Sequence, residues 1–503
     1  MALDVRRYQG PHERPDTVAG ADRMGRLTRV DLVQRSADVR TIRQRASLLS
    51  LLAMCAMAAL LLVPPLLHDF RDNPLNGDQS AHLLSTLSLA YDSHTLNIDR
   101  QDFERWRTVG WTDRPEYTYI QRYKDGWAAA KPYGYPLAMA PFVAVLGPVS
   151  GIALGNTLLL AALLAFGGRL LWRRFDPVTA ALIFAAFFVA GYIYMYAYPV
   201  QIELAHALVV LVGFGAAYRY RESNRLAWAC LSFAAMAFGV AEKPPFLVLF
   251  APIAALMLWN ERQRLGRFAT LFGIGTITYA IAIVPYLVYS DGRSTSAYNG
   301  DRYQLPADPN VPAPWDGGRP GVDLPAVAGD TGGYLQRALD LSVLDWMESF
   351  AYYLVGRHTG LIVTLPFALL LVGATLARAR KADSWALAIL GGILCYIAFY
   401  VILFTGNYYG GGQSLGNRYF IQMSTAVLVL ALVTPLRERT LRWLAAAAIG
   451  LSVLLTLPHH RAPEVAFTNI LTTSAPQRLL PIEANQDYTW IFKQEWEKAG
   501  PTR

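Results

Sequence analysis

The sequence predicts an all-α polytopic membrane protein with about eleven transmembrane helices and an outer helical loop after the first of them. Three observations predict this fold class: the composition, a series of long apolar runs, and arginine clusters that recur at every second loop. Of the 503 residues, 54% are apolar and only 16% are charged, whereas a soluble domain carries about 25% charged residues. This composition excludes an ordinary soluble enzyme and a disordered chain. The net charge of +8 fits positively charged cytoplasmic loops, and we expect no nucleic-acid partner.

The apolar runs divide the chain into three parts. Residues 1–46 are polar and too charged for a signal peptide, so we expect a cytoplasmic N-terminal segment there. The transmembrane bundle occupies residues 47–457, and residues 458–503 form an extracytoplasmic tail.

Eleven runs within this bundle have the character of membrane spans, each of which takes about 20 apolar residues. The first span is Ala46–Leu67. The others lie at about 152–172, 177–197, 200–218, 226–241, 244–259, 268–289, 358–377, 384–404, 419–435 and 440–457. The shorter stretch Tyr135–Leu146 predicts an interfacial or re-entrant helix.

Arginine clusters set the predicted orientation. Ten Arg precede the first span, and the later clusters fall at every second loop, as a cytoplasmic N-terminus requires. These later clusters begin at Arg169, Arg219, Arg262, Arg378 and Arg437. We therefore expect an integral protein of a bacterial-type inner or plasma membrane, with segments 68–151, 290–357 and 458–503 on the outer side. The expected cytoplasmic segments hold 25 of the 45 Lys and Arg but 11 of the 37 Asp and Glu.

Two further features bear on this architecture. The stretch Leu305–Gly333 is rich in Pro, Gly and Asp, which predicts a loop with little regular structure. Cys55, Cys230 and Cys395 all lie in apolar runs, so we expect small buried thiols and neither disulfides nor metal ligands.

The first outer loop carries an acidic residue at the start of a predicted helix. Asp78 follows Gly77 and precedes a pattern in which Leu83, Leu84 and Leu87 would face the membrane surface. Asp78 and His82 are four residues apart and therefore share one helical face. One interpretation is an acid favoured by the helix dipole, and the other is a general base held at the membrane surface.

Ionisable residues gather at the outer ends of the predicted spans. A charge within the bilayer core costs about 2.5–3.5 kcal/mol, so each needs a reason to be there. Anchoring or mutual ion pairing is one explanation, and a shared binding site is the other. The residues concerned are Glu203, His206, Glu242, Lys243, Arg357, His358, Asn417 and Arg418.

Within such a site, the cations suit a phosphate. Arg357 and Arg418 offer bidentate contacts, and Lys243 offers a point charge. His206 or His358 could hydrogen-bond a leaving phosphate or a hydroxyl group.

The loop that precedes Asn417 contains three consecutive glycines, Gly410 to Gly412, after Tyr408 and Tyr409. It is either a flexible connection or a lining over the cavity in which Tyr409 stacks on a sugar face. No Walker or dinucleotide motif accompanies it.

No cofactor is predicted with certainty, and the histidines show no zinc-site spacing. A divalent cation bound by Asp78 and His82, with help from Glu203 or His206, remains an option.

An acid just after the first span, a helix, and then Lys131-Pro132-Tyr133-Gly134-Tyr135-Pro136 resemble the GT-C superfamily of polytopic glycosyltransferases. Protein O-mannosyltransferases and the aminoarabinose transferases of lipid A belong to it. The resemblance implies that Asp78 is catalytic and that Lys131 lies near the donor phosphate, whereas without it Lys131 is a snorkelling residue of an aromatic belt. Gln79 stands where a second acid often follows in these enzymes.

The predicted function is therefore a membrane glycosyltransferase. It would move a sugar from a polyprenyl-phosphate donor to a hydroxyl of a glycan, lipid or protein acceptor on the outer face, with inversion and with Asp78 as base. Two alternatives are a transporter or flippase of a lipid-linked saccharide and a lipid-linked glycan ligase or polymerase. A transporter favours ionisable groups near the midplane and inverted repeats, which are not found in the sequence, and a ligase centres its chemistry on residues 290–358.

Overall fold

The computed structural model describes a mostly helical chain. The described residues are 29–72, 77–92, 97–109, 117–123, 126–289, 302–306, 326–327, 339, 341–405, 416–461 and 475–481. The chain divides into two compact units, Met1–Leu49 and Ser50–Arg503, and helix α1 (Arg29–Leu67) runs from the first into the second. All features discussed below belong to the second unit.

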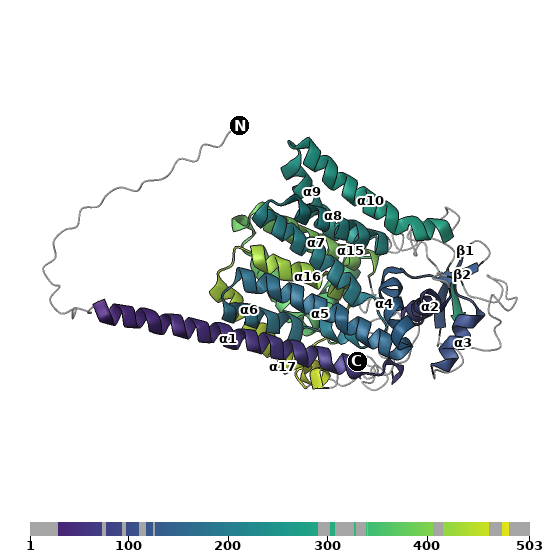
Figure 1. Ribbon diagram of the computed structural model, residues 1–503, viewed down its shortest axis with the longest axis horizontal. Coiled ribbons are helices and arrows are strands. Elements are labelled where there is room, and N and C mark those ends of the chain that lie inside the picture. The colour runs from purple at the N-terminus through teal and green to yellow at the C-terminus, as the bar shows by residue number, and fades with distance from the viewer. Residues whose placement is uncertain are drawn as a thin grey trace. The chain divides into compact units, whose positions relative to one another are not determined.

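The helices of the second unit form a bundle with an appended layer of shorter elements (Figure 1). Helices α2 (Gly77–Tyr91), α3 (Arg100–Thr108) and α4 (Gly134–Leu146) belong to that layer. The bundle comprises α5 (Pro148–Arg174), α6 (Pro177–Phe184), α7 (Glu203–Ser223), α8 (Leu226–Glu242), α9 (Phe246–Glu261), α10 (Leu265–Tyr289), α12 (Val343–Val355), α13 (Leu361–Thr364), α14 (Pro366–Leu376), α15 (Ser384–Leu403), α16 (Arg418–Val433) and α17 (Glu438–Arg461).

Five helices in the described part of the chain are long and apolar enough to cross a membrane. They are Gln44–Leu67, Pro148–Arg174, Leu265–Val288, Ser384–Leu403 and Glu438–Thr456. Six shorter apolar helices accompany them, among them α8, α9 and α16. Each of the eleven apolar runs coincides with helical structure, so the helical membrane-type fold is confirmed, whereas the number of spans stays a prediction.

Two of the apolar runs are broken rather than continuous helices. The run 177–197 consists of α6, a π-helical turn η2 (Ala185–Val189) and a 3-10 turn η3 (Ile193–Ala197). The run 358–377 divides at Leu365 into α13 and α14, because Pro366 begins the second helix and has no N–H to continue the first.

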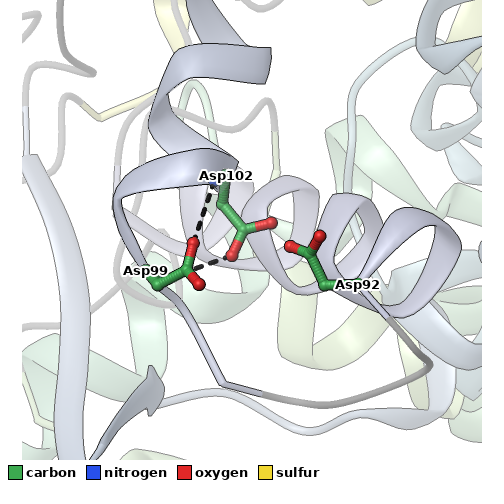
Figure 2. Close-up of side chains that lie close together, drawn as sticks. All are labelled: Asp92, Asp99 and Asp102. Carbon is green, nitrogen blue, oxygen red and sulfur yellow. Dashed lines mark hydrogen bonds between the residues drawn. The ribbon is translucent and has the colours of Figure 1, made fainter.

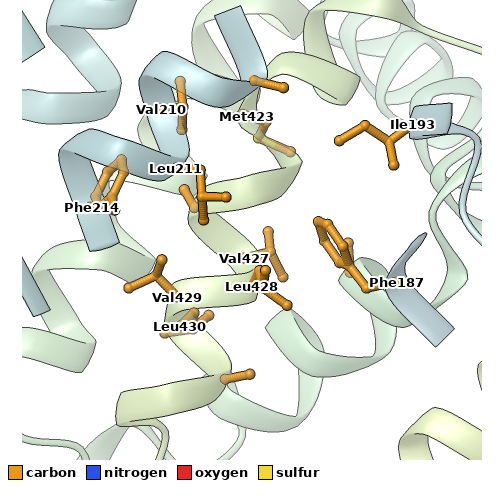
Figure 3. Packing of buried hydrophobic residues seen from close by; sticks show 14 of the residues in the cluster. Phe187, Ile193, Val210, Leu211, Phe214, Met423, Val427, Leu428, Val429 and Leu430 are labelled. Atoms are coloured by element: carbon orange, nitrogen blue, oxygen red, sulfur yellow. The ribbon is translucent and has the colours of Figure 1, made fainter. Parts of the chain in front are cut away.

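Helix α16 lies in the centre of the bundle, where it packs against α5, α7, α14 and α15. Fifteen of its sixteen residues are buried, and its side chains interlock with those of α7 and η2 around Phe187, Phe214 and Leu428 (Figure 3). A helix with an apolar surface on every side can carry charged groups only at its ends. Its polar residues near the N-terminus therefore have a specific environment, described below.

A small antiparallel sheet joins the two large segments predicted on the outer side. Its strand order is β2 (Gly126–Ala129), β1 (Tyr117–Tyr123), β3 (Arg302–Pro306) and β4 (Ala326–Val327). The register places Ile120 opposite both Ala129 and Tyr303. The sequence analysis does not predict this sheet, and most of the stretch 305–333 lies outside the described residues.

The predicted helix at Asp78 is confirmed as α2, but the predicted role of its apolar face is wrong. Leu83, Leu84 and Leu87 are fully buried inside the protein instead of facing a membrane surface. They belong to a second hydrophobic core that α2 shares with β1, α4 and α5. The reason is that the sheet and α4 cover α2, which hydropathy alone does not reveal.

The cysteines also differ from the expectation. All three are free thiols, but Cys55 and Cys395 are exposed on the surface of their helices and Cys230 is partly exposed. An apolar run identifies a membrane-type helix, not which of its sides faces the protein.

Candidate functional site

Asp78 lies at the beginning of α2, directly after a glycine with positive φ. Gly77 has a φ of 51°, a conformation that glycine adopts without steric cost. The Ser80 hydroxyl donates to the Gly77 carbonyl, and the Thr118 hydroxyl of β1 donates to Ser80. This turn, tied to the sheet, fixes the place from which the Asp78 carboxylate extends.

Two cations hold the Asp78 carboxylate. The Lys131 Nζ lies 2.5 Å from Oδ1, and an Arg418 guanidinium nitrogen lies 2.5 Å from Oδ2. Lys131 precedes α4 and its ammonium also lies 5.0 Å from the ring centre of Tyr119 on β1. Both carboxylate oxygens are thus paired with cations that come from distant parts of the sequence.

Arg418 is the first residue of the central helix α16. The Asn417 side chain caps this helix by accepting from the Tyr419 N–H, and Gly416 with a φ of 76° turns the chain into it. A cation at a helix N-terminus is unfavourable, because the macrodipole is positive there. The two carboxylates near its guanidinium, Asp78 at 2.5 Å and Glu203 at 3.9 Å, offset that cost.

Glu203, Gln422 and Lys243 extend the network into the bundle. Glu203 begins α7, Lys243 is the C-cap of α8, and Gln422 lies one turn after Arg418 on α16. The Gln422 amide nitrogen donates to Glu203 Oε1 at 3.5 Å, and its oxygen accepts from the Lys243 ammonium. We refer to Asp78, Lys131, Glu203, Lys243, Arg418 and Gln422 as the Asp78 cluster.

The charges of the Asp78 cluster do not cancel. Counted at their formal charges, three cations face two carboxylates, a difference of one positive charge. The side chains are 15% exposed for Asp78, 10% for Arg418, 9% for Lys131 and 2% for Glu203, so the cluster opens outward at Asp78 and closes toward Glu203. A buried excess of positive charge favours an anionic ligand.

The pKa of Asp78 lies well below its usual range. Burial raises the pKa of this carboxyl, but the charges of Arg418 and Lys131 outweigh that effect. Burial and the same two cations lower the pKa of the His82 imidazole to about 3. At neutral pH, therefore, Asp78 is ionised and His82 is uncharged.

His206 lies buried near Glu203 with its hydrogen-bonding capacity unused among the described residues. Its ring packs edge-on against Phe246 at 5.3 Å between centres, and neither ring nitrogen has a hydrogen-bond partner among the described residues. The Glu203 Oε2 atom is also without a hydrogen bond there. Buried polar atoms in native structures are nearly always paired with protein or water, so this part of the cluster has capacity to bind a polar ligand or water.

Glu242, a predicted site residue, is directed toward α4 instead of toward its neighbour Lys243. One of its carboxylate oxygens accepts from the Gly134 N–H at 2.9 Å, and the other accepts from the Tyr286 hydroxyl at 3.2 Å. It thereby caps the N-terminus of α4, three residues after Lys131. A Cβ on Gly134 would lie 2.5 Å from the Glu242 carboxylate, which explains the glycine.

Arg357 is engaged elsewhere. Its guanidinium donates to the carbonyls of Arg478 and Leu480, and its N–H donates to the Pro481 carbonyl. Gln477 in turn donates to the Arg357 carbonyl. Arg357 thus fixes a C-terminal segment against the start of α13, and the neighbouring His358 is fully buried.

The structure therefore brings together Asp78, Lys131, Glu203, Lys243 and Arg418, with His206 and Asn417 beside them. Tyr409 lies outside the described residues. Gln422 was missed, although a Gln one turn after Arg418 in an otherwise apolar run is a recognisable signal. The aromatic surroundings of Lys243 were missed as well: its ammonium lies 4.2 Å from the ring centre of Tyr419 and 5.6 Å from that of Tyr400.

A separate group of carboxylates, Asp92, Asp99 and Asp102, has oxygen atoms within 4.8 Å of one another (Figure 2). Asp99 and Asp102 exchange backbone-to-carboxylate hydrogen bonds that cap α3. Arg105 pairs with Asp92 and lies 3.5 Å from Asp102. These contacts explain the group as a helix cap with its counter-ion.

Asp78 is the first of the residues considered as ligands of a divalent cation. Because Lys131 and Arg418 occupy both oxygens of Asp78, a metal ion at this carboxylate would have to displace one of them. Both oxygens of Asp78 are thus occupied by cations of the protein itself.

Comparison of the chain with family models, curated proteins and solved structures finds no match.

Proposed function

We propose that the protein is a membrane glycosyltransferase that transfers a sugar from a polyprenyl-phosphate donor to an acceptor hydroxyl. The observation that carries the proposal is the Asp78 cluster: one carboxylate near the protein surface, held by two cations, in a network with an excess positive charge. The resemblance of Asp78 and Lys131–Pro136 to the GT-C superfamily points to the same reaction.

In the proposed reaction the acceptor oxygen attacks the anomeric carbon of the sugar. The bond from that carbon to the phosphate oxygen breaks, and the electron pair leaves with the polyprenyl phosphate. Asp78 takes the acceptor proton. Lys131 and Arg418 stabilise the negative charge that grows on the phosphate, a role for which preorganised cations are well suited. A single displacement of this kind inverts the anomeric centre.

The ion pairs of Asp78 imply that the donor binds before Asp78 takes the acceptor proton. A carboxylate whose pKa lies far below its usual range is a weak base. A donor phosphate that draws Lys131 and Arg418 toward itself raises that pKa, so Asp78 becomes an effective base only when the donor is bound. Glu203 and Lys243 remain as the fixed inner part of the cluster.

The finer topology belongs to the same proposal. We infer about eleven spans, a cytoplasmic N-terminus and an outer position for Asp78, supported by the alternating arginine clusters. The cluster residues begin or end helices: Glu203 begins α7, Arg418 begins α16 and Lys243 follows α8. This location at helix ends supports a transferase working at the membrane surface more than a transporter with a midplane site.

The test is Asp78→Asn in purified full-length protein, assayed for transfer with a panel of polyprenyl-phosphate sugars. We expect kcat to fall by about 100-fold or more, while the carrier phosphate still binds, because the cations keep their places and lose a competing anion. Asp69→Asn is the matched control, since Asp69 lies near the surface and forms an ion pair with nearby Arg71. Transfer at a near wild-type rate by Asp78→Asn would disprove the base assignment.

Parallel assay of Arg357→Gln separates the proposal from a glycan ligase. Because Arg357 binds backbone carbonyls of the C-terminal segment, we expect this variant to retain most of its transfer activity. A ligase centred on residues 290–358 predicts the reverse pattern, with Arg357 essential and Asp78 dispensable.

A further inference from the structure

A polar pocket of about 520 Å³ lies at the opposite end of α7 from the Asp78 cluster. Tyr220, Arg221 and Asn224 line it from the end of α7, Glu261 and Arg264 from the turn between α9 and α10, and Trp385 from the start of α15. From Glu203 to Tyr220 the helix rises by about 26 Å. The two sites are thus well separated, and we call this second one the Glu261 pocket.

Glu261 organises the floor of the pocket. It is 1% exposed, accepts from the Tyr220 hydroxyl, and forms ion pairs with Arg267 at 3.4 Å and Arg264 at 3.6 Å. Its Oε2 atom accepts no hydrogen bond within the described residues. That atom is itself buried and lies 3.6 Å from the Arg264 guanidinium, so Glu261 acts on the pocket through its ion pairs with the arginines.

The rim of the pocket carries cations with donors to spare. The Arg264 side chain is 55% exposed, and Arg221 shares one exposed ion pair with Asp383. The three surrounding loops, 219–225, 261–267 and 378–383, together contain nine Arg and Lys against three Glu and Asp, an excess of six positive charges. This end of the bundle consequently attracts anions.

Tryptophans place this end at a membrane surface. The exposed Trp259 ring lies beneath the Arg262 guanidinium at 4.0 Å, and Trp228 lies near Arg219 at 5.8 Å. Trp and Arg together are typical of the interface between lipid and water. The arginine distribution assigns this interface to the cytoplasmic side.

We propose that the Glu261 pocket binds the phosphate of an anionic phospholipid headgroup. Arg264 and Arg221 hold the phosphate from the rim, and Glu261 orients Arg264 through their ion pair. Basic pockets between helices on the cytoplasmic side suit this class of ligand. The proposal depends on the predicted orientation but not on the glycosyltransferase reaction.

The experiment titrates phosphatidylglycerol into the full-length protein in phosphatidylcholine nanodiscs, at high salt to weaken diffuse surface attraction. Loss of one charge-assisted hydrogen bond corresponds to about a tenfold or larger loss of affinity, which we expect for Arg264→Gln and for Arg221→Gln. Arg262→Gln is the control because it removes the same charge beside the pocket, where its guanidinium stacks on Trp259. Its expected loss is at most about fivefold.

Two outcomes overturn the proposal. In the first, the pocket variants bind phosphatidylglycerol as tightly as the Arg262→Gln control. In the second, the wild type shows no preference for phosphatidylglycerol over phosphatidylcholine and does not bind glycerol phosphate. A second arm adds soluble glycerol phosphate to the protein in neutral detergent. Binding there as tight as that of the lipid assigns the same phosphate chemistry to a soluble ligand, whereas much weaker binding assigns it to the lipid. Arg264→Gln, whose side chain is half exposed, keeps the test valid if Arg221→Gln disturbs the fold.

Discussion

The two ends of α7 show two ways to handle charge in an apolar bundle. At the Asp78 cluster, each carboxylate lies beside a cation of the protein, and the side chains of these ion pairs are at most 15% exposed. At the Glu261 pocket, a single buried carboxylate supports cations that remain open to solvent. In the first site the protein supplies the counter-ions and a ligand must compete with them. In the second the arginines at the rim remain accessible to an anion.

This comparison implies different energetic roles. Charges removed from water are costly unless paired, and breaking a buried pair leaves an uncompensated charge. Exposed pairs contribute little, because water screens them. Substitutions in the Asp78 cluster should therefore affect folding and function together, whereas those at the Glu261 pocket should affect ligand binding with little effect on folding.

The largest expected effect is that of Arg418→Gln. Removal of this cation leaves Asp78 and Glu203 without their shared partner, and we expect the free energy of unfolding to fall by about 3–5 kcal/mol. Denaturant titration in detergent measures it. Arg221→Gln is the matched control at the other end of α7, since its pair with Asp383 is partly exposed; its expected cost is at most about 1 kcal/mol. Similar losses for both variants would contradict the distinction between closed and open sites.

A smaller effect is expected from Gln422→Leu. This change removes the amide that accepts from Lys243 and donates to Glu203, and leaving those buried groups unsatisfied costs about 1–3 kcal/mol. The control is Ser424→Ala on the same helix, because the Ser424 hydroxyl donates to the Ile421 carbonyl of α16 itself. The same titration tests both, and a Gln422→Leu variant as stable as Ser424→Ala would show that the amide bridge is dispensable.

Gly416→Ala tests how the chain enters α16. Alanine at a φ of 76° is strained, and its Cβ would lie 2.7 Å from a methyl carbon of Thr364. We expect a cost of about 1–3 kcal/mol and reduced transfer activity, because Arg418 follows two residues later. Gly373→Ala is the control: it lies within α14 with open space around it, so its stability should be unchanged or higher by up to about 1 kcal/mol. Equal behaviour of the two variants would remove the argument for a fixed turn at Gly416.

Hydropathy determines how much of the fold and of the candidate site can be predicted from the sequence. It locates a residue along a helix, so the gathering of Glu203, Lys243 and Arg418 at helix ends, and the helical position of Asp78, were accessible. It does not give the direction in which a side chain points or the partner that it meets. The attachment of Arg357 to residues 478–481 therefore depends on tertiary packing, as does the burial of Leu83 beneath the sheet.

The same distinction explains the sheet. Strands β1 and β3 are separated by about 180 residues of sequence, and each is too short to show a clear alternation. Their pairing is a long-range choice that local pattern does not encode. The candidate site was thus predicted in its composition, whereas its connections through Gln422 and the covering of α2 were not.

The smallest expected effect is a change in the pH dependence of stability, and it differs between two helix caps of the same kind. Asp102 in α3 and Asp345 in α12 both occupy the third position of a capping box, but Asp102 is fully buried and Asp345 is partly exposed. Burial raises the pKa of Asp102 to about 8, with a further contribution from Asp92, whereas hydrogen bonds from Ser342 lower that of Asp345. The folded state therefore binds the Asp102 proton more tightly than the unfolded state does.

The sign of the effect follows from linkage. A raised pKa contributes stability that is present at about pH 4 and is lost as the pH rises to about 8. Asp102→Asn removes that titration, so its melting temperature should fall less than that of the wild type over this interval. Asp345→Asn should instead remove a stabilising contribution that is present above about pH 4 and is lost as the pH falls below it. Melting temperatures of the three proteins, measured at several pH values, test both expectations. Parallel pH dependences of the melting temperature for the wild type and Asp102→Asn would contradict the prediction. They would mean that Asp102 stays ionised and paired with Arg105, as Asp78 is paired with Arg418.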